Sequence, residues 1–291
     1  MGAGKNTLKR IVELVEAGHL PLRGAIVELG TQNVHCAGEP DRVGDFLQYF
    51  DRRGTLDRPL AGFSRSELLG IANDGYFGAL LKAAGFRYLA LDLFRAPDTR
   101  LFDLNLQFVP DELRGQFDLV TNLGTSEHLL NQMLCMRTIH DLAKPGGLIY
   151  HDLPLAGYHT HGYFKYNPVF FQDIAASNNY QVVSRSIAAG EWQKTPPDLR
   201  DLGYGEPGYH NSGLEIIFKK VGDCAFGIPV EARTSGTNLD GAVWTSATSA
   251  GGVTVVPVSP VDMFETVSFW SLQAAYWRRL RRGIKRRLGF A

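Results

Sequence analysis

Seven residues decide the fold of this chain: Gly24-Ala-Ile-Val-Glu-Leu-Gly30. They form a short apolar run with glycine at both ends, which is typical of a buried strand. Similar runs recur along the chain, and segments with helical spacing lie between several of them. Because strands that alternate with helices indicate a parallel sheet, we predict an α/β fold. It is Rossmann-like and doubly wound, with a mostly parallel seven-stranded sheet, helices on both faces and a C-terminal appendage.

The elements expected from the spacing fall into two sets. The strands are 24–30, 86–92, 99–106, 117–122, 148–152, 180–186 and 214–219, of which the last two form a closing pair. The helices are 11–17, 41–51, 64–84, 127–142 and 168–177. Ser64 with Glu67 three residues later predicts a capping box at one helix start. The breaker cluster Lys144-Pro-Gly-Gly147 predicts a helix end.

Composition excludes several classes of protein. The chain has 291 residues, 44% of them hydrophobic, with 30 Lys and Arg against 30 Asp and Glu. This apolar fraction excludes disorder, and three scattered Cys exclude a disulfide scaffold. The thiols fit a reducing compartment, and we find no signal peptide or membrane span. We therefore expect a cytoplasmic protein.

The composition changes along the chain and predicts three parts. Residues 1–221 form the α/β domain, 222–262 an accessory segment rich in Thr, Ser, Gly and Val, and 263–291 a basic amphipathic helix. Seven of the ten residues 278–287 are Lys or Arg, and Trp270, Tyr276 and Trp277 precede them. This pattern favours peripheral attachment to an anionic membrane surface, although a basic run can also bind RNA or be a solvated end. The core lacks basic residues with interleaved aromatics, so nucleic acid is not the expected partner.

Polar residues follow the predicted strands at the point where each strand ends. In an open α/β sheet, ligands bind outside the carboxyl ends of the strands. The residues at these ends are Glu28, Gly30, Thr31, Gln32, Asn33, Asp92, Leu93, Asp103, Leu104, the loop Asn122-Leu-Gly-Thr-Ser-Glu-His128 with Gly124, and the pair His151 and Asp152. Gly30 allows a tight turn, and an acid at the place of Asp92 can accept both hydroxyls of a ribose.

These residues, in this order, resemble the class I S-adenosylmethionine-dependent methyltransferases over about 24–220. Glu28-x-Gly30 is similar to the first motif of that family. Asn122 to His128 resembles the loop after its fourth strand, and Lys144-Pro-Gly-Gly147 the turn before its fifth. Glu127-His128 is similar to the Glu-His pair of many small-molecule methyltransferases. The resemblance implies the cofactor S-adenosyl-L-methionine.

The resemblance also implies which residues bind that cofactor. They are Glu28, Gly30, Thr31, Gln32, Asp92, Leu93, Asp103, Leu104, Asn122 and Gly124, with Asp92 on the ribose and Asp103 toward the adenine amine. The chain departs from the family at Gln32 and Val34, where glycines are usual. The spacing from Glu28 to Asp92 exceeds the about 30 residues of a strand, helix and strand unit. We therefore expect an insertion at about 38–65, of a kind that in this family often covers the substrate.

Methyl transfer to a hydroxyl needs a base, and histidine suits that role near neutral pH. The expected catalytic residues are His128 or His151 as base, with Asp152 to orient the imidazole. The pair His159-x-His161 with His151 and Asp152 is a possible metal set, but it lacks a spaced second pair, so no metal is expected. His128 beside Glu127 is also consistent with a capping arrangement at a helix start.

Three functions remain open on the sequence. The first is methyl transfer to a small-molecule or glycan-type acceptor, at oxygen. The second is a catalytically inactive binding protein or scaffold on the same fold, suggested by the altered first motif. The third is a dehydrogenase, which the missing GxGxxG after the first strand disfavours.

Overall fold

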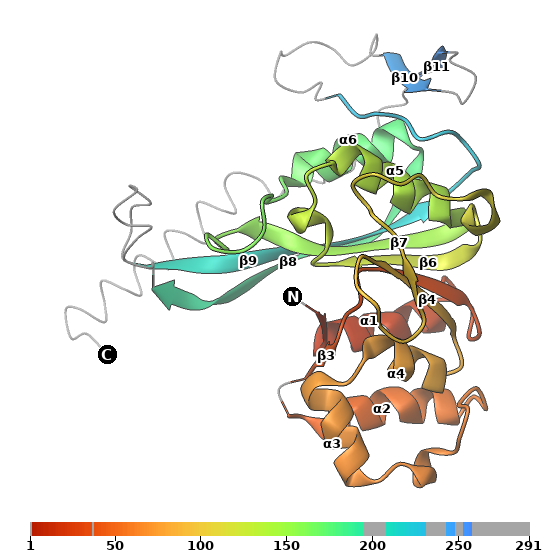
Figure 1. The fold of residues 1–291 in the computed structure, drawn as a ribbon, viewed down its shortest axis with the longest axis vertical. Coiled ribbons are helices and arrows are strands. Elements are labelled where there is room, and N and C mark those ends of the chain that lie inside the picture. Colours follow the sequence, from red (N-terminus) through yellow and green to blue (C-terminus); the bar gives the residue numbers. More distant parts are fainter. Residues whose placement is uncertain (1, 37, 195–207, 231–242, 248–252, 258–291) are drawn as a thin grey trace. The chain divides into compact units, whose positions relative to one another are not determined.

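The computed structural model describes residues 2–36, 38–194, 208–230, 243–247 and 253–257. Its main sheet has seven strands: β2 (Ala25–Leu29), β4 (Arg87–Asp92), β5 (Thr99–Leu101), β6 (Phe117–Leu123), β7 (Ala143–Ala156), β8 (Tyr180–Lys194) and β9 (Gly208–Lys220). Their order across the sheet is β5-β4-β2-β6-β7-β9-β8 (Figure 1). The first five are parallel, and β9 is antiparallel to both β7 and β8. The predicted sheet and its late strand pair are confirmed.

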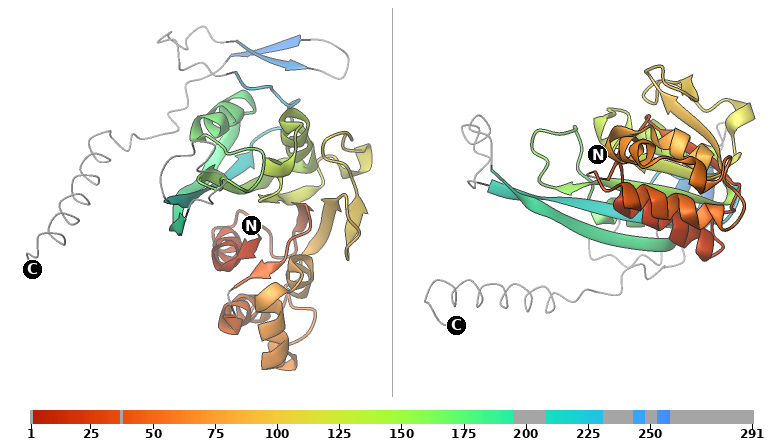
Figure 2. Two further views of the ribbon diagram at one scale, coloured as in Figure 1. Left: turned by 60° about the vertical axis from the view of Figure 1, so that its left-hand side comes forward. Right: turned by 90° about the horizontal axis from the view of Figure 1, so that it is seen from below.

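Helices cover both faces of this sheet (Figures 1 and 2). They are α1 (Lys5–Glu16), α2 (Pro40–Asp51), α3 (Arg65–Asp74), α4 (Phe77–Ala83), α5 (Gln132–Leu142) and α6 (Pro168–Ser177). Leu119, Leu148 and Ile217 from β6, β7 and β9 share one core cluster with residues of α1, α2 and α4. On the other face, the Phe171 ring of α6 lies 4.9 Å from the His151 ring. The expected α/β layering is therefore confirmed.

The first helix begins earlier than its apolar spacing predicts. We expected it over 11–17, but α1 spans Lys5–Glu16. Leu8 already continues the apolar stripe of Ile11 and Leu14, and all three are buried. The Gly4 N–H donates to the Thr7 hydroxyl at 3.2 Å, which satisfies one backbone donor near the helix start.

The single helix expected over 64–84 is two helices, α3 and α4, because the chain breaks at Gly75. A Cβ there would lie 2.5 Å from the Ile71 Cα, so only glycine fits. The Gly75 carbonyl accepts from the Val34 N–H at 2.7 Å instead of continuing the helix. The predicted capping box is present, with Ser64 and Glu67 bonded reciprocally at 2.7 and 3.1 Å.

Other boundaries also differ from the expectations. The helix expected over 127–142 starts only at Gln132, because the Asn131 side chain caps it by accepting the Leu134 N–H at 3.1 Å. Residues Ser126–His128 form a separate 3-10 turn, η3. The third strand ends at Leu101 instead of residue 106, and β7 begins at Ala143, so that the breaker cluster lies inside this strand as an irregularity of the pairing. β8 and β9 extend well beyond 180–186 and 214–219.

Between β2 and β4 the chain makes a long excursion. It leaves the sheet edge after Gln32 and returns at Tyr76, where the Phe77 N–H donates to the Gln32 carbonyl at 3.0 Å. An isolated bridge joins Asn33 to Tyr76. The excursion holds α2, α3, the 3-10 turn η1 (Leu60–Gly62) and the short strand β3 (Val34–His35), which pairs with β1 (Ala3–Gly4). The insertion expected at about 38–65 falls within this excursion.

The accessory segment contains a two-stranded antiparallel sheet of β10 (Val243–Ala247) and β11 (Val253–Pro257). The helix predicted over 263–291 lies outside the described residues. In the part of the chain that the structure describes, no helix has the length and apolar character needed to span a membrane.

An ion pair joins helix α1 to strand β9 of the sheet. The Arg10 guanidinium donates to Glu215 Oε1 from Nε at 3.0 Å and from Nη2 at 2.7 Å. The Tyr150 hydroxyl donates to Glu215 Oε2 at 2.8 Å. Glu215 is largely buried, so its carboxylate depends on these donors.

Replacing Arg10 tests this link. We expect Arg10→Ala to lower the free energy of unfolding by about 2 kcal/mol, because Glu215 loses a charged donor in a largely buried place. Urea unfolding measures the change. Lys9→Ala is the control, because Lys9 is exposed and its pair with Glu13 at 3.4 Å should contribute less than about 0.5 kcal/mol. Equal losses in the two variants would contradict the assigned role of the Arg10 link.

Candidate functional site

The strand order brings the polar strand ends together at one edge of the sheet. β2 lies between β4 and β6, with Leu29 opposite Leu91 and Glu28 opposite Thr121. From β2 the chain runs to β4 on one side and later to β6 on the other, so this is the point where strand order reverses. Ligands of open α/β sheets bind in the crevice at such a point.

Gly30 forms the turn at this crevice. Its φ is +69°, a left-handed conformation that favours glycine. A Cβ here would lie 2.7 Å from the Thr125 hydroxyl oxygen. That hydroxyl donates to the Leu29 carbonyl and accepts from the Gln32 side-chain amide, the latter at 3.3 Å. Gln32, where the family usually has glycine, thus joins the loop after β2 to the loop after β6.

Gly30→Ala should be more destabilising than its backbone conformation alone explains. Gly18 has a φ of +71° but open space around its missing Cβ, so Gly18→Ala measures the conformational cost by itself, about 1–2 kcal/mol. We expect Gly30→Ala to lose clearly more, because the methyl group displaces Thr125. Urea unfolding compares the two. Equal losses of unfolding free energy in the two variants would mean that Thr125 moves aside without a measurable cost.

Glu28 holds the same turn from inside the sheet. Its Oε2 accepts from the Tyr88 hydroxyl and from the Gln32 N–H, the latter at 3.3 Å, whereas Oε1 is buried with no hydrogen bond from the described residues. Burial raises the pKa of Glu28 to about 8, and the two hydrogen bonds only partly offset this. At neutral pH the side chain is therefore mostly a neutral acid.

The raised pKa of Glu28 makes stability depend on pH. Between its ordinary value of 4.5 and about 8, the folded protein keeps a proton that the unfolded chain has lost. The free energy of unfolding therefore falls as pH rises through this window, by up to about 1.4 kcal/mol per pH unit from this group. In Glu28→Gln this contribution is absent. The free energy of unfolding of the variant, measured in urea, should therefore increase relative to that of the wild type between pH 5 and pH 8. The exposed Glu16→Gln is the control, and a pH-independent difference for Glu28→Gln would contradict the assignment.

Asp92 stands at the end of β4, beside the Gly30 turn. Its Oδ2 accepts from the Thr31 N–H at 2.7 Å and from the Thr31 hydroxyl. Its Oδ1 accepts from the Phe94 N–H at 3.1 Å. The structure therefore brings Gly30, Thr31 and Asp92 together, and Thr31 holds one oxygen of the carboxylate.

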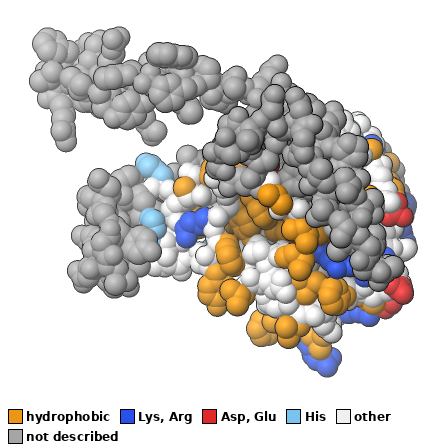
Figure 3. Space-filling view, turned by 90° about the horizontal axis from the view of Figure 1, so that it is seen from above, with side chains coloured by type: hydrophobic (Ala, Val, Ile, Leu, Met, Phe, Trp, Pro, Cys, Tyr) orange, Lys and Arg blue, Asp and Glu red, His pale blue; other side chains and the backbone are white. Residues whose placement is uncertain are grey.

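Apolar side chains are exposed next to these acids. Leu93 and Phe94 directly follow Asp92, and both are more than half exposed. Beyond β5, Asp103 accepts the Asn105 N–H at 2.8 Å, while Leu104 is buried. Hydrophobic side chains also gather in the middle of the described face seen in Figure 3. Exposed apolar groups beside a few polar ones are typical of a ligand site.

Two residues predicted for the site lie in the interior instead. The Asn122 amide donates to the Ser126 hydroxyl at 2.8 Å and lies 3.0 Å from His151 Nδ1. His151 is 2% exposed and packs on Phe171, and burial lowers its pKa to about 3. A ring in this place does not reach a ligand at the surface, because β7 turns His151 toward α6. Both residues support the loop from below.

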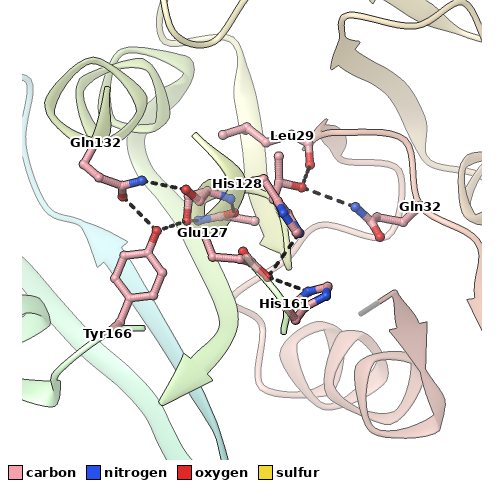
Figure 4. A network of polar contacts seen from close by, with 10 residues as sticks. Leu29, Gln32, Glu127, His128, Gln132, His161 and Tyr166 are labelled. Carbon is pink, nitrogen blue, oxygen red and sulfur yellow. Dashed lines mark hydrogen bonds and ion pairs between the residues drawn. The ribbon is translucent and has the colours of Figure 1, made fainter. Parts of the chain in front are cut away.

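His128 instead belongs to a cluster with Glu127 and His161 (Figure 4). Glu127 Oε1 lies 3.9 Å from His128 Nε2 and 3.6 Å from His161 Nε2. The Glu127 side chain is fully buried, whereas those of His128 and His161 are 47% and 36% exposed. Burial raises the pKa of Glu127 to about 7 and lowers the pKa of both histidines. The cluster thus opens to solvent through its two rings.

A second layer fixes the turn that carries this cluster. The Tyr166 hydroxyl donates to the Ser126 hydroxyl at 2.7 Å and lies 2.8 Å from Gln132 Oε1. The Gln132 amide donates to the carbonyls of Ser126 and Leu129, both at 2.6 Å. Sequence reasoning missed Tyr166 and Gln132, because no local pattern links a tyrosine after β7 to a glutamine at the start of α5.

Asp152 lies within β7, opposite Leu123, the last residue of β6. Burial raises the pKa of its carboxyl to about 6, and the nearby charge of Glu215 adds to the effect. The metal set considered from the sequence, with His151, Asp152, His159 and His161, does not form, because His151 is buried on the α6 side. Among the described residues, the side chains close enough to share an ion are Glu127, His128 and His161.

Two cavities lie elsewhere. One, of about 590 Å³, is lined mainly by residues of α1 and α2, among them Lys5, Phe46 and Tyr49. The other, of about 620 Å³, adjoins the amino ends of the strands near Asp118 and Lys144. Neither includes the strand-end residues described above, so we place the site by its chemistry at the carboxyl edge.

The sequence from 69 to 187 matches a protein family described as Methyltransferase domain. The match runs from α3 into β8, and so includes Asp92, Asp103 and the cluster around Glu127, but not Gly30. No curated protein sequence matches the chain.

Three solved structures illustrate the likeness in three dimensions. The 1,6-didemethyltoxoflavin-N1-methyltransferase of Burkholderia thailandensis is 14% identical, over 75% of this chain and 78% of that one, with a TM-score of 0.38. A putative methyltransferase of Bacillus halodurans is 9% identical, over 73% and 99%, with a TM-score of 0.39. The YcgJ protein of Bacillus subtilis is 12% identical, over 73% and 97%, with a TM-score of 0.40. TM-scores below 0.5 assign neither fold nor activity to this chain.

Proposed function

We propose that this chain is a class I S-adenosylmethionine-dependent methyltransferase that transfers a methyl group to an oxygen atom of a small-molecule acceptor, and the match of residues 69–187 to a methyltransferase domain supports this. One observation carries the proposal. The Gly30 turn has Asp92 on one side and, through Thr125, the loop of Glu127 and His128 on the other. A cofactor bound at this turn would thus have polar groups of the cluster next to it.

The residues at the edge fit the cofactor. The Gly30 turn has no room for a Cβ, and the Asp92 carboxylate is partly exposed. The Glu28 Oε1 atom is buried and accepts no hydrogen bond from the described residues. We propose that Gly30, Thr31 and Gln32 hold the amino-acid portion and Asp92 the ribose hydroxyls. Leu93, Asp103 and Leu104 would border the nucleobase, while Asn122 and Gly124 shape the loop beneath it. The bound cofactor supplies an electrophilic methyl group on a sulfonium.

We assign binding of the acceptor to the loop after β6. Methyl transfer is an in-line displacement, so the acceptor oxygen must face the sulfonium and lose its proton. Of the two bases expected from the sequence, we retain His128, which is half-exposed, and not His151, which is buried. We place the acceptor against the cluster of Glu127, His128 and His161, with Asp152 at its margin.

A finer proposal concerns the acceptor class and location. A glycan-type or lipid-linked acceptor and peripheral attachment to a membrane are supported only by the basic sequence of 263–291, which lies outside the described residues. The basic run would draw the enzyme to anionic lipid, where such acceptors are handled.

A second candidate function is a binding protein without catalysis. This function is favoured by the hydrogen bonds that Asp92 already makes. The Thr31 N–H and hydroxyl both donate to Asp92 Oδ2, which is an oxygen that a ribose would use. If that contact persists, only Asp92 Oδ1 is left for the ribose hydroxyls, and it already accepts from the Phe94 N–H.

Calorimetric titration with S-adenosylhomocysteine decides between these functions. We expect micromolar binding by the wild type and a loss of at least about tenfold in Asp92→Ala, because two charged hydrogen bonds disappear. Thr31→Val removes the competing hydroxyl and should keep or improve affinity. NAD should not bind. Absence of binding at millimolar S-adenosylhomocysteine would overturn the proposed function, while binding without turnover on any acceptor would favour the second candidate.

A further inference from the structure

We propose that Glu127, His128 and His161 form a binding site for one divalent transition-metal ion, which holds the acceptor oxygen next to the cofactor. The metal site itself stands on the geometry of the cluster. Its role in holding the acceptor rests on the function proposed above.

The three side chains offer ligand atoms at nearly the right separation. One ligand atom from each of the three residues lies within 4.8 Å of the other two. Glu127 Oε1 lies 3.9 Å from His128 Nε2 and 3.6 Å from His161 Nε2. Ligands at about 2.1 Å from an ion in tetrahedral or octahedral geometry are about 3.0–3.4 Å apart. The two distances to the carboxylate exceed this range by about 0.2 and 0.5 Å, and the ligand atoms of the two rings, at most 4.8 Å apart, must move closer by up to about 1.4 Å. The rings meet edge to face at 82°, with centroids 4.7 Å apart.

Among the described residues, the carboxylate in this cluster has no hydrogen-bond partner. Glu127 is fully buried, and neither of its oxygens makes a hydrogen bond to these residues. His161 Nε2 is likewise buried without a hydrogen bond from the part of the chain that the structure describes. Buried polar groups are normally satisfied, and a buried charge without a partner is costly. An ion between these atoms would satisfy both groups at once.

The backbone holds the two ligand segments together. The Glu127 carbonyl accepts the N–H groups of Tyr163 and Phe164, at 2.7 and 3.1 Å. Gly162, with φ +67°, lets the loop pass so close that a Cβ would lie 2.8 Å from Glu127 Cγ. The loop of His161 is thus fastened to η3, and in Figure 4 both rings point toward the carboxylate. Such support lowers the cost of ordering the ligands when an ion binds.

The donor set indicates the kind of ion. Two imidazoles and one carboxylate suit Zn²⁺, Mn²⁺ or Fe²⁺ better than Mg²⁺ or Ca²⁺, which prefer oxygen ligands. Three protein ligands leave coordination positions open, as in catalytic and not structural sites. The half-exposed rings provide a path from solvent to these positions.

An ion here would prepare an acceptor hydroxyl for methylation. Coordination lowers the pKa of the hydroxyl, so its proton leaves to water. The oxygen electron pair then forms the bond to the methyl carbon, and the pair of the broken carbon–sulfur bond goes to sulfur. S-adenosylhomocysteine and the methyl ether are the products. In the metal-loaded protein, His128 is a ligand instead of a base, and the ion promotes loss of the acceptor proton in its place.

Metal titration of the full chain tests the site without any acceptor. We expect EDTA-treated and dialysed protein to bind one Mn²⁺ or Zn²⁺ per chain in calorimetry, with micromolar or tighter affinity. Glu127→Gln and His161→Gln should each weaken binding by at least about tenfold, since each removes a ligand. His159→Gln is the matched control, because His159 lies in the same loop outside the cluster, and it should bind as the wild type does.

A stability readout separates loss of a ligand from loss of the fold. Mn²⁺ should raise the Tm of the wild type and of His159→Gln but not of Glu127→Gln. Without metal, Glu127→Gln should be at least as stable as the wild type, because a neutral amide replaces a buried carboxyl without a hydrogen bond. No binding of Mn²⁺ or Zn²⁺ at millimolar concentration would overturn the proposal. Equal weakening in His159→Gln would also overturn it.

The same samples distinguish failure of the site from failure of the proposed function. Binding of S-adenosylhomocysteine in EDTA together with no metal binding would remove the metal site and leave the methyltransferase function standing. Metal binding without S-adenosylhomocysteine binding would keep the site and remove its role in methyl transfer.

Discussion

The contact between the Thr125 hydroxyl and the Leu29 carbonyl joins the two loops on which the site depends. It lies where β2 and β6 diverge, and it fills the space that a side chain at position 30 would need. The left-handed turn at Gly30 presents Thr31 to Asp92, and two residues beyond Thr125 lies Glu127. A shift of this one contact would move the Gly30 turn and the cluster of Glu127, His128 and His161 together.

Buried carboxyl groups set the chemistry on both sides of this contact. Glu28 lies beneath the Gly30 turn, Glu127 belongs to the cluster with His128 and His161, and burial raises the pKa of both carboxyl groups. Glu28 finds donors in Tyr88 and Gln32, whereas Glu127 finds no hydrogen bond in the described part of the chain. This difference in partners explains why we assign Glu28 to holding the turn and Glu127 to holding a ligand.

Apolar periodicity predicted the layers of the fold, because burial of strand and helix faces is a property of local sequence. It failed where a tertiary contact ends an element. Gly75 breaks a long helical pattern by bonding back to Val34, and Asn131 caps α5 after a separate turn at Ser126–His128. β8 and β9 extend beyond the apolar residues that predicted them, because the two strands pair with each other along their length. Backbone pairing stabilises strand residues whatever their side-chain pattern.

The sequence by itself determined the α/β class, the acids at the strand ends and the Glu127-His128 pair, because each depends on a short run of residues. Only the tertiary structure decided which way those side chains face. His151 and His128 read alike in the sequence, yet β7 turns one ring into the core against Phe171 while the turn after β6 leaves the other half-exposed. His161 joins Glu127 across 34 positions of the chain only because two backbone hydrogen bonds fasten its loop to η3. Residues so far apart in sequence meet through packing, which no local spacing encodes.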